Sequence, residues 1–366
     1  MKFGVLSETG HLEKRVSVVP SVVAKLISAG HSIHIEQGAG LRAGFDDEMY
    51  RTQGAVVASR SEVVSSCECL LRVAVPTAAE IDELRQGQSL VSYIYPKRHA
   101  DVLSALAVKG VNVFAMDALP RITRAQTMDV LSSQNNLAGY KAVVIGAAEL
   151  GRIFPLMMTA AGTVPPAKVL IYGAGVAGLQ AIATSRRLGA QVEVTDVRPE
   201  TKEQVESLGA KFITVEGLDQ VNVQGGYVAA IGDDVLARQK AAVEKSLLNA
   251  DLIICTALVT GGKAPTLITA EQVGRMKRGA VIIDMAAEAG GNCELTRADE
   301  RVEHNGVLVL GPTDLASSAA QNASELYAKN VLAFLMHVAK AEGINYDSSD
   351  EITSATLVVH NGQVRQ

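Results

Sequence analysis

The sequence predicts an α/β protein with two Rossmann-like parallel-sheet domains, separated by a cleft and joined by long helices. Strand-like apolar segments alternate with helix-like segments in two successive series. A glycine-rich turn opens the second series, and 366 residues with 48% hydrophobic content suffice for two cores. We expect an N-terminal domain of residues 1–124 plus 323–366 and a second domain of residues 125–322, which begins with a linking helix.

The first series runs to about residue 120. Helix-like segments separate its strands: residues 21–30 end on a glycine, and Ala100–Lys109 lies between the last two strands. A long helical region follows, at roughly Ala125–Thr159. The expected strands of this series cover residues 3–6, 32–36, 54–58, 69–73, 89–94 and 111–116.

The second series extends from Val169 to about Gly311, with later strands that read K-F-I-T-V, D-L-I-I-C-T-A, A-V-I-I-D-M-A and V-L-V-L-G. A final helix, Ala323–Ala341, follows when the second sheet is complete, so we expect it to pack on the first domain. The pattern T-L-V-V-H-N-G-Q-V-R then predicts a hairpin with Asn361-Gly362 as its turn.

The most specific pattern is K-V-L-I-Y-G-A-G-V-A-G-L-Q-A, a G-x-G-x-x-G turn between an apolar strand and an amphipathic helix. Gly173 permits the tight turn, Gly175 lets the backbone approach a pyrophosphate, and Gly178 lets the helix pack close to the sheet. The helix N-terminus presents free N–H groups to the phosphates. Asp196, at the tip of the next strand, suits both hydroxyls of an adenosine ribose and favours NAD(H). We expect Arg198 to point to solvent, which would preserve this preference.

Composition excludes several other classes. The net charge of −5 gives no basis for nucleic-acid binding. The longest uncharged run, Val169–Ser185, is too short and glycine-rich to span a bilayer, and the N-terminus lacks a signal-peptide pattern. We therefore expect a cytosolic chain. The cysteines should be buried and reduced, and no spacing of cysteine or histidine predicts a metal site.

A polar segment between the two series, Arg121–Tyr140, contains candidate catalytic side chains. Gln126 and Asp129 are three residues apart, so they would share one face of a helix, and Ser132 would extend that face by another turn. On spacing alone, this face is either a solvated surface between the domains or part of a ligand site.

This segment closely resembles the R-x-S-R-A-Q-x-x-D-x-L-S-S stretch of the NAD(H)-binding domain of proton-translocating NAD(P) transhydrogenase, in the alanine dehydrogenase/transhydrogenase superfamily. The resemblance continues through T-K-E-Q-V-E-S-L-G-A-K-F-I-T-V after Asp196, then G-G-Y and T-A-L, to V-I-I-D-M-A-A-E-A-G-G-N-C at residues 281–293. It implies an oxidoreductase component that transfers hydride directly between its own NAD(H) and NADP(H) on a partner chain. A membrane component would couple this transfer to proton translocation.

The resemblance also implies roles for individual residues. A mobile loop, residues 224–239, would fold over the bound nucleotide, with Tyr227 as its characteristic tyrosine. Gln126 would bridge toward the second nucleotide, while Arg121 and Asp129 orient the nicotinamide and its ribose. The implied catalytic residues are Arg121, Gln126, Asp129, Ser132 and Tyr227; the implied nucleotide contacts are Gln126, Thr127, Met128, Asp129, Gly173, Ala174, Gly175, Val176, Ala177, Gly178, Asp196, Val197, Arg198, Gly226, Gln239, Ala257 and Leu258.

Direct hydride transfer needs no general base, so positioning and water exclusion would carry catalysis. The implied partners are a second copy of the chain in a homodimer, an NADP(H)-binding beta subunit and a small membrane alpha subunit, which would hold the chain on the cytoplasmic face of the inner membrane. The chain lacks the membrane helices of longer family members, so we interpret it as the separate first alpha chain of the three-polypeptide bacterial arrangement or as a truncated form. The initial Met and the terminal hairpin favour the former.

The main alternative is a soluble amino-acid dehydrogenase of the alanine dehydrogenase type, which is similar at L-E-K-R-V-S-V-V-P, around Arg15. Such enzymes add a substrate-binding Lys and a catalytic His, where this chain has Arg72 and Tyr95; His99 would serve only in a different strand register. A third alternative, a non-catalytic NAD-sensing module, is disfavoured by the intact nicotinamide-end residues. The chain departs from the transhydrogenase pattern at Arg72, usually a Lys, and at Ala316–Ser318, where the family usually has an arginine.

Overall fold

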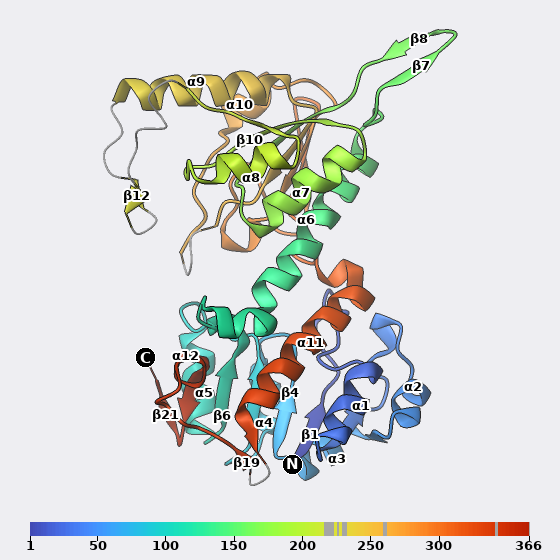
Figure 1. Ribbon diagram of the computed structural model, residues 1–366, viewed down its shortest axis with the longest axis vertical. Coiled ribbons are helices and arrows are strands. Elements are labelled where there is room, and N and C mark those ends of the chain that lie inside the picture. The colour runs from blue at the N-terminus through green and yellow to red at the C-terminus, as the bar shows by residue number, and fades with distance from the viewer. Residues whose placement is uncertain (216–222, 225–226, 229–232, 259–261, 341–342, 366) are drawn as a thin grey trace. The chain divides into compact units, whose positions relative to one another are not determined.

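The structure is a computed structural model that describes residues 1–215, 223–224, 227–228, 233–258, 262–340 and 343–365 (Figure 1). The chain divides into two compact units, Met1–Gln134 with Ala316–Gln366, and Asn135–Leu315. Each unit contains one large sheet of mainly parallel strands, so the predicted α/β fold class is confirmed. Among the described residues, no helix has the length and apolar character needed to cross a membrane.

The first unit is built on an eight-stranded sheet in the order β21-β20-β6-β5-β4-β1-β2-β3. The strands from β6 to β3 are parallel, β20 is antiparallel to β6, and β21 is antiparallel to β20. The strands are β1 (Lys2–Val5), β2 (Ser32–Glu36), β3 (Val56–Ala58), β4 (Cys69–Leu71), β5 (Ser89–Ser92), β6 (Asn112–Ala115), β20 (Leu357–His360) and β21 (Gln363–Val364).

Helices flank this sheet, and their starts follow from local sequence. α3 and α4 each begin with a capping box, in which Ser59 pairs with Glu62 and Thr77 with Glu80. The helices of the unit are α1 (Pro20–Ser28), α2 (Asp47–Thr52), α3 (Arg60–Ser66), α4 (Ala78–Glu83), α5 (Ala100–Val108), α11 (Ala320–Val338) and α12 (Glu351–Thr356), with the short 3₁₀ helices η1 (Leu41–Ala43), η2 (Met116–Ala118), η3 (Thr123–Met128) and η6 (Ser317–Ala319) and the small pair β18 (Ala339–Lys340) and β19 (Gly343–Ile344).

The C-terminal segment completes the first unit, as its apolar pattern predicts. Tyr327, Phe334 and Leu335 of α11 are fully buried in the same core as β1 and β2. The predicted hairpin is confirmed, since Asn361 and Gly362 have φ values of 49° and 74°, which suit a tight turn between β20 and β21.

The second unit is built on a seven-stranded sheet in the order β11-β10-β9-β14-β15-β17-β16, parallel except for β16. Its strands are β9 (Lys168–Tyr172), β10 (Gln191–Thr195), β11 (Lys211–Phe212), β14 (Leu252–Cys255), β15 (Val281–Asp284), β16 (Arg301–His304) and β17 (Val307–Leu310), with two separate pairs, β7 (Met157–Thr159) with β8 (Gly162–Val164) and β12 (Val223–Gln224) with β13 (Tyr227–Val228). Its helices are α7 (Val176–Arg187), α8 (Thr201–Ser207), α9 (Asp233–Asn249), α10 (Ala270–Arg275) and η5 (Ala287–Ala289).

The helix expected at residues 125–159 is wrong at both ends. The α-helix α6 covers only Val130–Glu149, beginning in the first unit and continuing in the second. Before it, Asp129 has φ −70° and ψ 91° and its carboxylate accepts the Ser132 N–H at 2.9 Å, so this short polar side chain caps a new helix start. After α6, β7 and β8 form an exposed hairpin that extends from the second unit (Figure 1).

Candidate functional site

The glycine turn between β9 and α7 forms the cradle that the sequence predicts. Gly173 has φ +100°, a left-handed conformation that favours glycine. A Cβ on Gly178 would fall on the carbonyl oxygen of Gly173, so only glycine permits this approach of helix and turn. A Cβ on Gly175, in contrast, would meet no atom within 4 Å. The turn therefore leaves open space at Gly175, the N-cap of α7, where the first N–H groups of the helix are available to an anion.

Asp196 lies beside this cradle, directly after β10. Its Oδ2 accepts the backbone N–H of Ala174 at 2.6 Å, so the carboxylate is tied to the turn itself. Arg198 donates to both carboxylate oxygens, from Nε to Oδ1 and from Nη2 to Oδ2, each at 3.0 Å. The expectation that Arg198 points to solvent is therefore wrong: a carboxylate with 5% exposure needs donors, and the nearby guanidinium supplies them.

These contacts fix the charge of Asp196. Burial alone would raise the pKa of its carboxyl, but the hydrogen bonds from Arg198 and from the Ala174 N–H outweigh burial and hold the pKa below its ordinary value. The group is therefore an acceptor at neutral pH. A ribose hydroxyl that binds it would have to share or replace the bonds of Arg198.

The predicted contact residues Ala257 and Leu258 follow β14. The Thr256 hydroxyl donates to the Tyr172 carbonyl at 3.0 Å, which joins this strand end to the glycine turn. Leu258 is 54% exposed and Ala257 half-buried. The wall of the cradle is therefore a β14 extension with an apolar side chain at its surface.

Two polar residues that the sequence analysis did not single out support this wall. The Asn292 side chain, fully buried, accepts the Ala257 N–H at 3.1 Å and donates to the Ala257 carbonyl at 2.9 Å. Asp284 in turn accepts the Asn292 backbone N–H at 2.6 Å and the Thr296 hydroxyl at 2.6 Å. Their signal in the sequence was the stretch I-D-M-A-A-E-A-G-G-N, an acid at a strand end followed by a double glycine and an asparagine.

The nicotinamide-end residues lie in the first unit. Gln126, Thr127 and Met128 belong to η3; the first two are exposed, whereas Met128 packs in the core. The predicted common helical face of Gln126, Asp129 and Ser132 is wrong, because the chain changes direction at Asp129. Asp129 and Ser132 nevertheless meet, with the Ser132 hydroxyl donating to Oδ2 at 2.6 Å. The exposed Arg121 precedes η3.

The predicted loop over the nucleotide, residues 224–239, is only partly described. Gly226 lies outside the described residues, and Tyr227 lies on β13, whose backbone pairs with β12. Gln239 lies on α9, where its Nε2 donates to the Ile213 carbonyl at 3.0 Å. Its Oε1 is buried and accepts no hydrogen bond within the described part of the chain.

Arg72 and Arg15, at the positions relevant to an amino-acid dehydrogenase, are both occupied by internal partners. Arg72 is 2% exposed, with Nη2 at 2.9 Å from Glu8 and Nη1 at 2.6 Å from Glu80. Arg15 donates from Nε and Nη2 to Glu13 at 2.8 and 2.6 Å.

The carboxylates around Arg72 titrate in opposite directions. Burial raises the pKa of Glu8 despite the neighbouring Arg72. Burial would also raise the pKa of Glu80, but its hydrogen bonds with Arg72 and the Thr77 N–H outweigh this and lower it to about 2.

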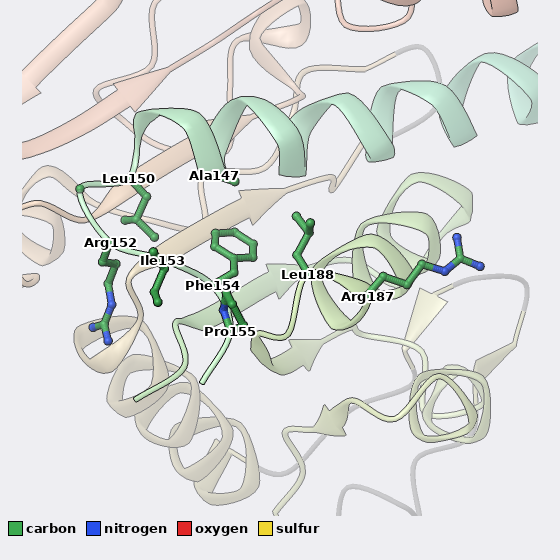
Figure 2. Close-up of a pocket in the computed structure, with 9 residues that line it drawn as sticks. Ala147, Leu150, Arg152, Ile153, Phe154, Pro155, Arg187 and Leu188 are labelled. Atoms are coloured by element: carbon green, nitrogen blue, oxygen red, sulfur yellow. The ribbon is translucent and has the colours of Figure 1, made fainter. Parts of the chain in front are cut away.

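A hollow of about 840 Å³ in the second unit is separate from the cradle (Figure 2). It lies at the C-terminal end of α7, a helix of 12 residues that spans roughly 18 Å, whereas the glycine turn lies at the N-terminal end. Across the described ranges, no group of three or more His, Cys, Asp or Glu residues is arranged to hold a metal ion. The hollow is lined by Ala147, Leu150, Gly151, Arg152, Ile153, Phe154, Pro155, Arg187 and Leu188.

Comparison with known proteins agrees with this site. The family model "Alanine dehydrogenase/PNT, N-terminal domain" matches residues 4–138, and "Alanine dehydrogenase/PNT, C-terminal domain" matches residues 142–366. The first of the split NAD(P) transhydrogenase alpha subunits of Rhodospirillum rubrum is 46% identical over 374 residues, which cover 100% of this chain and 97% of that protein. The alanine dehydrogenase of Bacillus subtilis is 28% identical, with 100% of this chain and 92% of that protein covered.

Solved structures give the same order of similarity. The crystal structure of transhydrogenase from Sinorhizobium meliloti superimposes with a TM-score of 0.92 at 42% identity, and each chain is fully covered. An L-alanine dehydrogenase superimposes with a TM-score of 0.83 at 27% identity, covering 100% of this chain and 96% of that chain. The chain therefore belongs to the alanine dehydrogenase/PNT family, in which it is more similar to the NAD(P) transhydrogenase alpha subunits than to these alanine dehydrogenases.

Proposed function

We propose that this chain is the NAD(H)-binding component of a proton-translocating, Re/Si-specific NAD(P) transhydrogenase. The observation that carries the proposal is the open cradle at Gly175, bordered by Asp196, in a chain 46% identical to an NAD(P) transhydrogenase alpha subunit. The chain would transfer hydride between NAD(H) in this cradle and NADP(H) on a beta subunit, and a small membrane alpha subunit would complete the complex. Its place would be the cytoplasmic face of the bacterial inner membrane, reached through these partners.

The residues fit NAD(H) binding without a metal or a general base. NAD(H), when bound, supplies or accepts a hydride at the nicotinamide ring. The α7 N-terminus would hold the pyrophosphate, and Asp196 would accept bonds from the adenosine ribose. Gln126 and Asp129 would orient the nicotinamide end, so the protein would contribute positioning and water exclusion.

The contacts of the two arginines argue against amino-acid oxidation. Arg72 and Arg15 form short ion pairs with Glu8, Glu80 and Glu13, so neither offers an unpaired cation to a substrate carboxylate. Releasing either arginine would leave a buried carboxylate without its partner, which costs roughly 3–5 kcal/mol. The transhydrogenase proposal is therefore better supported than the dehydrogenase alternative.

The test combines the purified chain with an NADP(H)-binding partner chain and measures hydride exchange between the nucleotides. We expect exchange only in the combination, and no NADH production from alanine by the chain alone. Gln126→Asn should depress exchange by roughly a hundredfold while NADH binding stays close to that of the parent chain, since a small displacement of the rings is costly. Gln37→Asn, at an exposed glutamine of the same unit, is the matched control and should leave exchange unchanged. Robust alanine-dependent NADH production, or parental exchange by Gln126→Asn, would refute the proposal.

We also propose that the chain works as a homodimer, and the β7–β8 hairpin supports this. Its apolar side chains lie in water: Leu156 is 55% exposed and Met158 76%. Both strands are exposed along their whole length, so the hairpin has no covering element among the described residues. A second copy that covers this arm would bury the apolar surface, and two-fold symmetry would let the arms do so reciprocally. Light scattering should show twice the 38.5 kDa of one chain, and a monomer would contradict the proposal.

A further inference from the structure

The 3₁₀ helix η3, which contains Gln126, is too short to hold its own backbone in place. Ala125 and Met128 anchor it through buried side chains in the core of the first unit. Apolar packing fixes the depth of the segment, but it is non-directional and does not fix the orientation of the peptide groups. Directional contacts are needed for that, and α11 supplies one.

The contact comes from Asn330, a residue of α11 that is 8% exposed. Its Nδ2 donates to the carbonyl of Thr127 at 2.8 Å, and its Oδ1 accepts the hydroxyl of Ser133 at 2.7 Å. Thr127 precedes the change of chain direction at Asp129, and Ser133 follows it on α6. One side-chain amide thus bridges the two arms of the bend that carries Gln126 and Asp129.

Only one orientation of the amide satisfies both partners. The Thr127 carbonyl must face the amide nitrogen, and the Ser133 hydroxyl faces the amide oxygen. Without Asn330 the Thr127 carbonyl would lose this donor in a poorly solvated place, which costs roughly 1–3 kcal/mol and favours a shift of η3 toward water. A shift of η3 would move Gln126 relative to Asp129, whose carboxylate is fixed to Ser132.

We propose that Asn330 is a positioning residue for hydride transfer, acting through Thr127 and Ser133 on the relative placement of Gln126 and Asp129. This inference rests on the proposed transhydrogenase function and extends it to a residue that does not touch the nucleotide. Asn330 sets the geometry of the bend, while Asp129 and Ser132 cap the helix that follows it.

The first unit contains a matched control. Asn112, on β6, is 6% exposed and also binds backbone and side chains, since its Oδ1 accepts the Asn361 N–H at 3.1 Å and contacts His360 Nδ1 at 3.0 Å. These partners belong to the C-terminal hairpin and not to η3 or α6. Asn112→Ala therefore removes a comparable buried amide from the same unit without touching the bend.

The experiment compares Asn330→Ala, Asn330→Asp and Asn112→Ala in the full chain. Three quantities are measured: the melting temperature, the Kd for NADH of the chain alone, and kcat and KM for exchange with the NADP(H)-binding partner chain. We expect Asn330→Ala to lower kcat roughly tenfold to a hundredfold with a Kd within about twofold of the parent. Asn330→Asp keeps the acceptor for Ser133 but loses the donor to Thr127, so its kcat should fall as well. Asn112→Ala should lower the melting temperature and leave kcat unchanged.

A second pair of variants tests the bridge itself. Ser133→Ala should lower kcat less than Asn330→Ala does, and the double variant should be no worse than Asn330→Ala, because both changes break the same link. Parental kcat in Asn330→Ala, or an equal kcat loss in Asn112→Ala, would overturn the positioning role while the parent chain still exchanges hydride. Absence of exchange in the parent chain would instead refute the proposed function.

Discussion

Gly175 and Gly178 allow nucleotide binding to be separated from stability. Gly175 has φ −76° and ψ −172°, an extended conformation open to any residue, and a Cβ there meets no atom within 4 Å. Gly175→Ala therefore adds a methyl group that the folded chain accommodates, at the place where a pyrophosphate would have to approach the backbone. The substitution should leave the fold intact and block the ligand.

The size of both effects follows from this geometry. Replacing glycine reduces the entropy of the unfolded chain and stabilises by about 0.4–1 kcal/mol, but alanine is a poorer N-cap by a comparable amount. The two terms offset each other, so the melting temperature should stay within about 3 °C of the parent. The Kd for NADH should rise at least about tenfold, equivalent to about 1.4 kcal/mol.

Gly178→Ala is the contrasting variant. Its Cβ would fall on the Gly173 carbonyl oxygen, and neither backbone segment can yield as a flexible side chain could. Overpacking of this kind costs about 1–3 kcal/mol, which lowers the melting temperature of a domain of this size by roughly 3–10 °C. Calorimetry and NADH fluorescence titration measure the two quantities. Parental NADH affinity in Gly175→Ala would falsify the assignment of the cradle.

Four further predictions can be checked on the purified chain. NADH should bind well ahead of NADPH, because a 2′-phosphate would meet the charge of Asp196, and Arg198→Ala should widen the gap; equal affinities would contradict the assignment. Met158→Asp should convert a homodimer into a monomer in light scattering, whereas a dimer that persists would exclude the hairpin from the interface. Tyr227→Ala should weaken NADH binding modestly and slow exchange by loosening the expected loop, which unchanged binding and rate would disprove. Glu80→Gln should destabilise the chain by about 3 kcal/mol at pH 7; because the folded pKa of Glu80 is depressed to about 2 and its unfolded value is about 4.3, the deficit should shrink between about pH 5 and pH 2 in melting scans, and a constant deficit would refute the ion pair.

Much of the fold could be predicted because local pattern and tertiary structure agree. Each expected strand of the two series has a counterpart, and the apolar face of α11 packs as predicted on the first unit. The helix expected at residues 125–159 failed where periodicity was a weaker signal than a single polar group. Asp129 ends one helix and caps the next, and a spacing rule that treats the segment as continuous does not detect this.

The candidate site shows the same division. The glycine turn and Asp196 are local signals, in which residue types at fixed spacing carry the chemistry. The support of Ala257 by Asn292 and of Thr127 by Asn330 depends on residues that are distant in the chain, so it requires the folded arrangement. Arg198 was misjudged for a related reason, because its orientation depends on how far Asp196 is buried.

The assembly of the first unit from both ends of the chain has a consequence for biosynthesis. Residues 1–134 leave the ribosome first, but the pairing of β20 with β6 and the packing of α11 require residues beyond 316. The second unit, residues 135–315, is continuous and can complete its sheet earlier. Until the C-terminal segment emerges, β6 is an open sheet edge and the core beneath α11 is uncovered, which makes the nascent chain a target for chaperones and for aggregation. Limited proteolysis of nascent chains arrested after residue 315 should find the second unit protected and the first unit cleaved.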